Sequence, residues 1–276
     1  MKTTAKLSEK ILAFLTWLAA TLTVGVFVFT VGFVLVKGIP HIKPSLFALS
    51  YTSENVSLLP ALISTVIMTL LSLVIAVPLG LFAAIYLVEY AKRGSKAVAV
   101  VRMTTETLSG IPSIVYGLFG LLFFVTFLGW GFSVLAGAFT LAIMILPLMM
   151  RSSEEALKSV PDAYREGSFG LGAGKLRTVF RVILPSAMPG ILAGVILSIG
   201  RIVGETAALV YTAGTVAQIP VSPLQSARTL SVHMYALSSE GLRTNEGYAT
   251  AVVLLLLVIV INALSSKIAK KIGRNA

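Results

Sequence analysis

The sequence predicts an all-α integral membrane protein with six transmembrane helices. Of its 276 residues, 57% are apolar and only 12% are charged, and the mean hydropathy is +0.94. A typical soluble domain carries about 25% charged residues. Uncharged runs also recur along the chain, and about 20 apolar residues suffice to cross the hydrocarbon core of a bilayer. These observations exclude a soluble globular domain.

The uncharged runs give the bounds of the predicted spans. The run 107–150 is too long for one helix, and it divides at Gly129-Trp130-Gly131, where the glycines favour a turn and the indole favours the membrane interface. The first span is expected to be retained rather than cleaved, because its apolar run is longer than that of a signal peptide. The six spans are predicted at 11–36, 59–88, 107–128, 132–150, 190–213 and 247–266.

The placement of Lys and Arg predicts the orientation. With the N-terminus inside, 17 of the 22 basic residues lie in cytoplasmic segments. Outside remain Lys37, Lys43, Arg228 and Arg243, and Arg201 falls within a span. This is the positive-inside pattern, so we expect a multi-pass protein of the inner (cytoplasmic) membrane with both termini cytoplasmic. The net charge of +11 then needs no nucleic-acid partner.

The chain offers few groups for metal or redox chemistry. It has no cysteine, and its two histidines, His41 and His233, lie in different outside loops, so no metal site is expected. No separate soluble domain can be delimited. We expect residues 1–58 to form the first transmembrane helix with an outside loop. Residues 59–270 are expected to form the main transmembrane domain, with a charged cytoplasmic loop at 151–189.

The charged loop is predicted to contain two short helices. Pro161 and Asp162 suit the first turn of one helix, and Gly172 is expected to end it. A second helix is expected at about 175–184, ended by Pro185, with Pro189 starting the next span. Its apolar stripe would consist of Leu176, Phe180, Ile183 and Leu184. This construction favours a docking surface for a soluble partner, and the alternative is a helical hairpin lying on the bilayer.

The glycine-rich stretch of this loop is not a nucleotide site. A phosphate-binding loop requires Gly, four residues, then Gly-Lys and a hydroxyl residue. Here Phe169 replaces the first glycine and Leu176 replaces the hydroxyl residue.

Arg201 and Glu205 are the predicted substrate-contacting pair. Four residues separate them, so they are expected on one helix face. Counted from Pro189, Arg201 lies roughly 18 Å into the span, where a charge is costly and usually functional. A guanidinium suits a tetrahedral oxyanion, while the carboxylate could accept a hydrogen bond from hydrogen phosphate and would repel sulfate. Thr206 adds a hydroxyl. The alternative is an ion pair that only holds helices together.

One motif in the charged loop resembles a known family. Glu166-Gly-Ser, three residues, Gly172, nine residues and Val182-Ile-Leu184-Pro185 is similar to the "EAA" signature of ABC importer permeases, with departures at Gly167, Ser168 and Val182. The resemblance implies the type I (MetI-like) permease fold. It also implies that this loop forms coupling helices seated in a groove of a cytoplasmic ATPase. The ATPase-coupling residues would be Glu166, Gly167, Gly172, Leu176, Phe180, Leu184 and Pro185.

Two further segments narrow the resemblance. Glu106-Thr-Leu-Ser-Gly-Ile-Pro-Ser-Ile-Val-Tyr-Gly117 and Gly200-Arg-Ile-Val-Gly-Glu-Thr206 resemble permeases of phosphate importers, most closely those of PstA type, over residues 60 to 269. This implies a non-catalytic subunit that forms half of the pathway of an ATP-driven inorganic phosphate importer. The implied partners are a PstC-type permease, a PstB-type ATPase dimer that binds ATP and Mg, a PstS-type external phosphate-binding protein, and membrane lipid. No cofactor is expected in this chain.

Other functions stay open. The substrate could be another oxyanion, such as phosphonate or a sulfate-like anion. An ion-coupled secondary transporter would usually carry more spans and inverted repeats. An intramembrane enzyme would need a nucleophile and base or metal ligands within the bilayer. Glu106, four residues after Arg102, is interpreted as a helix-end pair with that arginine, and a direct contact with the substrate is the alternative.

Overall fold

The computed structural model describes residues 2–92, 94–239, 241 and 243–275, and side chains within 9–267 and at 271. Arg93 lies outside the described residues, as do the side chains of Lys2, Lys6, Lys270 and Arg274. The predicted cytoplasmic placement of these five basic groups therefore stays a prediction. The described residues are helical with connecting turns and contain no strand. The main helices are α1 Lys2–Gly38, α2 Leu59–Ile85, α3 Lys96–Ser109, α4 Ser113–Gly120, α5 Val134–Lys158, α8 Leu184–Gly204 and α11 Thr244–Asn275.

Shorter elements connect these helices. Two short 3₁₀ turns, Ile39–His41 and Pro44–Phe47, follow α1. Three π-helical segments, which have i→i+5 bonding, extend other helices: η3 Tyr86–Tyr90, η4 Leu121–Phe127 and η5 Val179–Ile183. The remaining short helices are α6 Asp162–Gly170, α7 Lys175–Thr178, α9 Ala207–Val210 and α10 Leu230–Ser239.

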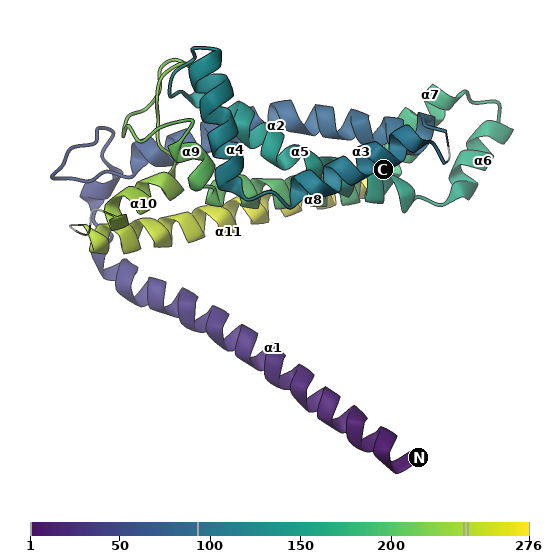
Figure 1. The fold of residues 1–276 in the computed structure, drawn as a ribbon, viewed down its shortest axis with the longest axis horizontal. Helices are drawn as coiled ribbons and strands as arrows, with labels where there is room; N and C mark the ends of the chain where they lie inside the picture. Colours follow the sequence, from purple (N-terminus) through teal and green to yellow (C-terminus); the bar gives the residue numbers. More distant parts are fainter. Residues whose placement is uncertain (1, 93, 240, 242, 276) are drawn as a thin grey trace.

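The centre of the bundle is α5, which packs against α2 on one side and α8 on the other (Figure 1). Close approach depends on glycine. A side chain at Gly80 of α2 would meet the Met149 Cβ at 2.8 Å, and one at Gly190 of α8 would meet the Ala156 Cβ at 2.7 Å. In lipid there is no hydrophobic driving force between helices. Small residues at the interface let the helices approach closely, so that van der Waals packing holds them together. These contacts fix α8 antiparallel along α5.

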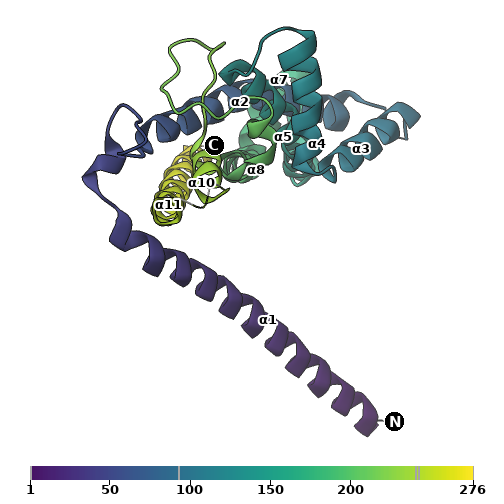
Figure 2. The same cartoon turned by 60° about the vertical axis from the view of Figure 1, so that its left-hand side comes forward.

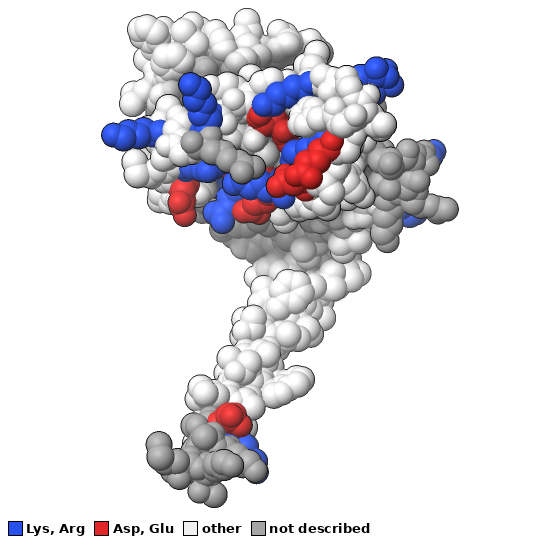
Figure 3. Space-filling view, turned by 90° about the vertical axis from the view of Figure 1, so that its right-hand side faces the viewer, with Lys and Arg blue, Asp and Glu red and all other residues white. Residues whose placement is uncertain are grey.

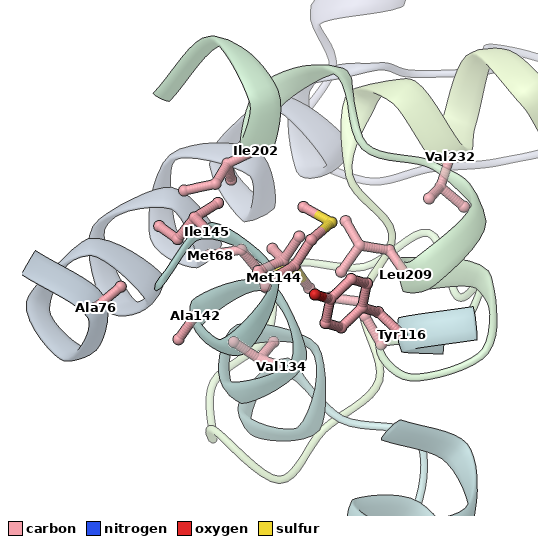
Figure 4. Close-up of a cluster of buried hydrophobic side chains, with 13 residues drawn as sticks. Met68, Ala76, Tyr116, Val134, Ala142, Met144, Ile145, Ile202, Leu209 and Val232 are labelled. Atoms are coloured by element: carbon pink, nitrogen blue, oxygen red, sulfur yellow. The ribbon is translucent and has the colours of Figure 1, made fainter. Parts of the chain in front are cut away.

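The largest buried cluster joins six helices, among them α10 through Val232 (Figure 4). Met68 of α2, Tyr116 of α4, Ile145 of α5 and Ile202 of α8 meet there, together with Leu209 of α9. Tyr116 keeps its hydroxyl satisfied, because it donates to the Leu108 carbonyl at 2.7 Å. The cluster therefore ties the ends of α4, α8 and α9 to the α2–α5 pair.

The predicted third span, 107–128, is wrong as a single straight helix. The chain forms α3 up to Ser109, turns at residues 110–112, and continues as α4 and η4 at an angle of 100° (Figure 1). Pro112 explains the break, since it lacks an N–H and disfavours helical geometry at the residue before it. The predicted turn at Gly129 and Gly131 is confirmed, with φ values of +68° and +63°.

The predicted fifth span, 190–213, also has different bounds. Helix runs without a break from Lys175 to Gly204 through both prolines, so Pro185 does not end a helix and Pro189 does not begin one. The π-helical η5 lies directly before Pro185. A proline ring clashes with the carbonyl four residues earlier, and a wider turn at that point relieves the clash. At its other end the helix stops at Gly204, well short of the predicted residue 213.

Five described helices are long and apolar enough to cross a membrane, and the bent α3–α4 pair makes a sixth candidate. α5 continues to Lys158, so the predicted charged loop begins as helix rather than at residue 151. α1 diverges from the bundle and touches it only near its C-terminal end, where Phe33 packs edge-on against Tyr248 of α11 (Figures 1 and 2). The rest of α1 exposes apolar side chains along its length.

Candidate functional site

Arg201 lies in the last turn of α8 and lines a cavity between α3, α5 and α8. The volume of this Arg201 cavity is about 450 Å³. The α5–α8 register sets its depth: Gly194 lies opposite Ser152, so Arg201 lies near the level of Pro147. Pro147 is roughly 16 Å along α5 from Lys158, at about 1.5 Å per residue. The charged residues lining the cavity are Arg102, Glu106, Arg151, Glu154, Glu155, Lys158 and Arg201.

The predicted sharing of one helix face by Arg201 and Glu205 is wrong. The helix ends at Gly204, and Glu205 is extended, with φ −71° and ψ 129°. The Glu205 carboxylate accepts a hydrogen bond of 3.0 Å from the Ala208 backbone N–H, and its carbonyl accepts one from Ser231. A carboxylate at this position accepts a hydrogen bond from an otherwise unpaired N–H in the first turn of α9. This contact favours the end of α8 at Gly204 over its continuation. Glu205 therefore holds the α8–α9 turn.

The rest of the predicted site lies around this turn. Glu205 is buried, while Arg201 and Thr206 are half-buried. The Thr206 hydroxyl has a long contact of 3.5 Å with the Gly204 carbonyl. The described residues include no ion pair between Arg201 and Glu205. The structure thus leaves Arg201 facing the cavity and assigns Glu205 a backbone contact.

The interpretation of Arg102 and Glu106 as a helix-end pair is also wrong. Arg102 pairs with Glu154 of α5 at 2.7 Å, and Lys158 pairs with the same carboxylate at 2.6 Å. Glu106 instead lines the cavity with Arg201. Sequence reasoning missed Glu154 because it placed residue 154 in a loop. The Glu154–Lys158 spacing of four was the available signal for a helix.

The predicted first helix of the charged loop is confirmed. α6 begins at Asp162, and Gly172 follows it with φ +81°, a left-handed conformation that favours glycine. Gly167 and Gly170 face open space, and Glu166 is exposed. The predicted second helix, 175–184, exists as the start of the long helix that continues into α8.

The predicted apolar stripe of this second helix does not face one environment. Ile183 is fully buried, whereas Leu176 is 65% exposed and Phe180 is 41% exposed. Thr178 and Val179 occupy the buried side instead. Leu184 and Pro185 are half-buried where the helix enters the bundle. Leu176 and Phe180 are therefore free to contact another molecule.

Exposed apolar and charged side chains gather on the α6–α7 segment, residues 159–178, and its extension into η5. Exposed large apolar residues there are Tyr164, Phe169, Leu171, Leu176 and Phe180. Figure 3 shows that Lys, Arg, Asp and Glu concentrate on the end of the molecule that carries these elements. A surface of this kind fits a protein interface with an apolar centre and a charged rim. Within the described residues, no group of three His, Asp or Glu side chains is placed to hold a metal ion.

Comparison with known proteins decides the family. Residues 76–275 match the model of the family described as "Binding-protein-dependent transport system inner membrane component". The chain belongs to this family. Its members are the non-catalytic membrane subunits of ABC importers, and a separate chain provides the ATPase.

Individual relatives agree with this membership. The chain is 31% identical over 252 residues to "Probable ABC transporter permease protein YqgI" of Bacillus subtilis, covering 86% of this chain and 85% of the relative. It is 38% identical over 215 residues to "Phosphate transport system permease protein PstA" of Pasteurella multocida, covering 75% and 74%.

A solved structure supports the fold. One chain of a bacterial ABC transporter involved in the import of the acidic polysaccharide alginate superposes with a TM-score of 0.67 at 16% identity, covering 94% of this chain and 96% of that chain. The all-α fold of ABC importer permeases is therefore confirmed. As a family member, the chain works with a second permease, an ATPase and a binding protein.

Proposed function

We propose that this chain is a permease subunit of an ATP-driven importer of inorganic phosphate and forms half of its translocation pathway. The observation that carries the proposal is Arg201, a cation at the end of a transmembrane helix that lines a cavity between α3, α5 and α8. The 38% identity to a relative named as a phosphate transport permease supports phosphate as the substrate.

In this proposal Arg201 binds the anion directly. A guanidinium offers two parallel N–H donors to two oxygens of a tetrahedral anion. Thr206 contributes a hydroxyl near the same helix end, and Glu205 fixes the backbone turn through Ala208. Glu106 lines the same cavity. Its carboxylate is therefore better placed than that of Glu205 to accept a hydrogen bond from a protonated anion and so to distinguish it from a fully ionised one.

The α6–α7 segment is the proposed contact with the ATPase. Glu166, Gly167 and Gly172 belong to the exposed α6 side, and Leu176 and Phe180 add exposed apolar surface on the second helix. Leu184 and Pro185 mark the entry of this helix into the bundle. Because helix is unbroken from Lys175 to Gly204, a displacement of α7 would reach Arg201 through one rigid element.

We further propose PstC-type, PstB-type and PstS-type partners, with ATP and Mg bound by the ATPase. The inner membrane is the proposed location, with both chain ends and the α6–α7 segment cytoplasmic. In support, the N-terminal end of α1 and the C-terminal end of α11 extend toward the same side of Figure 1 as α6 and α7. Residues 1–58 and 59–270 remain our proposed division, consistent with the separation of α1 from the bundle.

The test is uptake by vesicles containing the complete transporter. Wild type should accumulate phosphate only with internal ATP. Arg201→Gln should abolish uptake while the variant still assembles with its partners, since the anion loses its counter-charge. Lys96→Gln removes an exposed cation at the start of α3 and serves as the matched control. Uptake driven by a proton gradient alone, or normal uptake by Arg201→Gln, would contradict the proposal.

A further inference from the structure

Arg165 of α6 points away from the exposed face of its helix and into the protein. Its Nε and Nη2 donate to Glu89 Oε1 at 3.1 and 2.8 Å. Nη1 donates to the Val160 carbonyl at 2.8 Å, and Nη2 to the Leu157 carbonyl at 3.0 Å. Nη1 also contacts Asp162 at 3.1 Å. One side chain therefore joins α6, the C-terminal end of α5 and the η3 end of α2.

The contacts at the end of α5 have a clear physical basis. The last carbonyls of a helix have no partner within the helix, and that end carries partial negative charge. Leu157 presents such a carbonyl, Val160 lies just past the end of the helix, and the Arg165 guanidinium donates a hydrogen bond to both carbonyls. Arg165 thus holds α6 at a fixed angle to α5.

The contact with Glu89 is buried on both sides. The Arg165 side chain is 15% exposed and the Glu89 side chain 8% exposed. Within the part of the chain that the structure describes, Arg165 is the only ion-pair partner of Glu89. A buried carboxylate needs its partner because an unpaired charge there is strongly unfavourable. The pair is consequently a stiff connection, unlike an exposed salt bridge.

A second contact holds the same end of α2. The Lys175 ammonium of α7 lies 4.9 Å from the centroid of the Tyr90 ring, which is adjacent to Glu89. The helices α6 and α7 also contact each other, because the Ser168 and Thr178 hydroxyls lie 2.8 Å apart. The η3 end of α2 is therefore held from α6 and from α7.

We propose that Arg165 and Glu89 form a mechanical joint through which movement of α6 is passed to α2; this rests on the proposed contact of the α6–α7 segment with an ATPase. Glu166, next to Arg165, faces outward and is available to the partner, whereas Arg165 faces inward. Movement of α7 passes directly into α8, because both belong to the unbroken Lys175–Gly204 helix. The joint makes α2, on the other side of α5, move together with α8. Arg165 is a positioning residue and does not contact the substrate.

The first test measures phosphate uptake and ATP hydrolysis together in vesicles with the complete transporter. Arg165→Gln and Glu89→Gln should each lower the phosphate moved per ATP hydrolysed by roughly tenfold, within the usual range of coupling between sites. The double variant should be no worse than either single variant, because both residues belong to one contact. Glu246→Gln is the matched control, since it removes a partly exposed ion pair with Arg243 that lies outside the α6–α7 segment and should contribute little.

A second measurement does not depend on the substrate. The chain has no cysteine, so Tyr86→Cys in η3 and Ala163→Cys in α6 provide two unique labelling positions, both exposed. In a complex with cysteine-free partners, the distance between spin labels should stay narrow and unchanged between the nucleotide-free and ATP-trapped states. Arg165→Gln should broaden it, and Arg165→Lys should give an intermediate width.

The outcomes separate the two proposals. If wild type fails to import phosphate, the proposed substrate is wrong, and the label distances still test the joint. An unchanged phosphate-to-ATP ratio in both single variants would overturn the joint. So would a label distance that changes between nucleotide states in wild type, or one that stays narrow in Arg165→Gln.

Discussion

The guanidinium of Arg102 in α3 lies 2.7 Å from the carboxylate of Glu154 in α5, at the end of the Arg201 cavity nearer to α6. Lys158 shares the same carboxylate at 2.6 Å. The Glu154 side chain is only 12% exposed, whereas Arg102 and Lys158 are 45% and 50% exposed. A single carboxylate thus pairs with two cations between Arg201 and the α6 end of the molecule, and it offsets one of their two positive charges.

Glu154→Gln should slow the release of phosphate. The substitution leaves Arg102 and Lys158 without their counter-charge, so an anion leaving Arg201 meets two unneutralised cations and dissociates more slowly. We expect the maximal uptake rate to fall about five- to tenfold, corresponding to roughly 1–1.4 kcal/mol. The measurement is initial uptake at saturating phosphate. Glu246→Gln is the control, because its pair with Arg243 does not line the cavity; an equal loss in that variant would contradict the prediction.

Glu106→Gln should weaken discrimination between phosphate and sulfate. Glu106 lines the cavity with Arg201, and a carboxylate there can accept a hydrogen bond from hydrogen phosphate but repels sulfate. Removing the charge removes the repulsion, so sulfate should compete at least about tenfold better for phosphate uptake. Competition assays at fixed phosphate measure this ratio. An unchanged sulfate inhibition constant would show that Glu106 does not face the anion.

The apolar runs of the sequence predict the membrane spans well because bilayer crossing depends on composition and length alone. Local signals also predict α6, since proline and an acidic residue at its start and Gly172 after its end act within a few residues. The prolines were less informative. Pro112 breaks a span, whereas Pro185 and Pro189 lie inside one helix. Whether a proline breaks a helix depends on whether neighbouring turns can widen, as η5 does.

The site was harder to predict because its contacts join distant residues. Arg201 is proposed as a site residue from the cost of placing a charge within a span, which is a property of one position, and this role stays a prediction. Glu205 was paired with it by helical spacing, but its carboxylate binds the Ala208 N–H after the helix has ended. Arg165 and Glu89 are 76 residues apart, and a single sequence contains no signal for such a contact.

Gly117→Ala should destabilise the folded chain. A Cβ at Gly117 in α4 would lie 2.8 Å from the Ala208 Cα and 3.2 Å from the Ala207 carbonyl oxygen, and backbone atoms cannot move aside locally. Overpacking of this kind typically costs about 1–3 kcal/mol. Thermal unfolding of the purified chain in detergent measures the loss. Gly200→Ala is the matched control, because nothing lies within 4 Å of its Cβ position and alanine favours helix, so its Tm should be unchanged or higher.

His233 should make the stability of the protein depend on pH. The side chain is fully buried in α10, its ring meets the Tyr51 ring edge-on at 6.0 Å, and the Arg228 guanidinium lies 4.6 Å from that same Tyr51 ring. Burial, with a further contribution from the positive charge of Arg228, lowers the pKa of His233 to about 3. His233 is therefore neutral in the folded protein across the physiological range.

The sign of the effect follows from proton binding. Between the unfolded pKa of about 6.5 and the folded pKa, only the unfolded chain binds a proton at this residue, so stability is full above pH 6.5 and falls as the pH decreases toward 3. The loss approaches about 1.4 kcal/mol per pH unit. His233→Phe keeps an aromatic ring beside Tyr51 but binds no proton. Urea unfolding in detergent between pH 4.5 and 7.5 should show a smaller slope in the variant, and identical slopes would contradict the buried neutral state, because every other titrating group is common to both proteins.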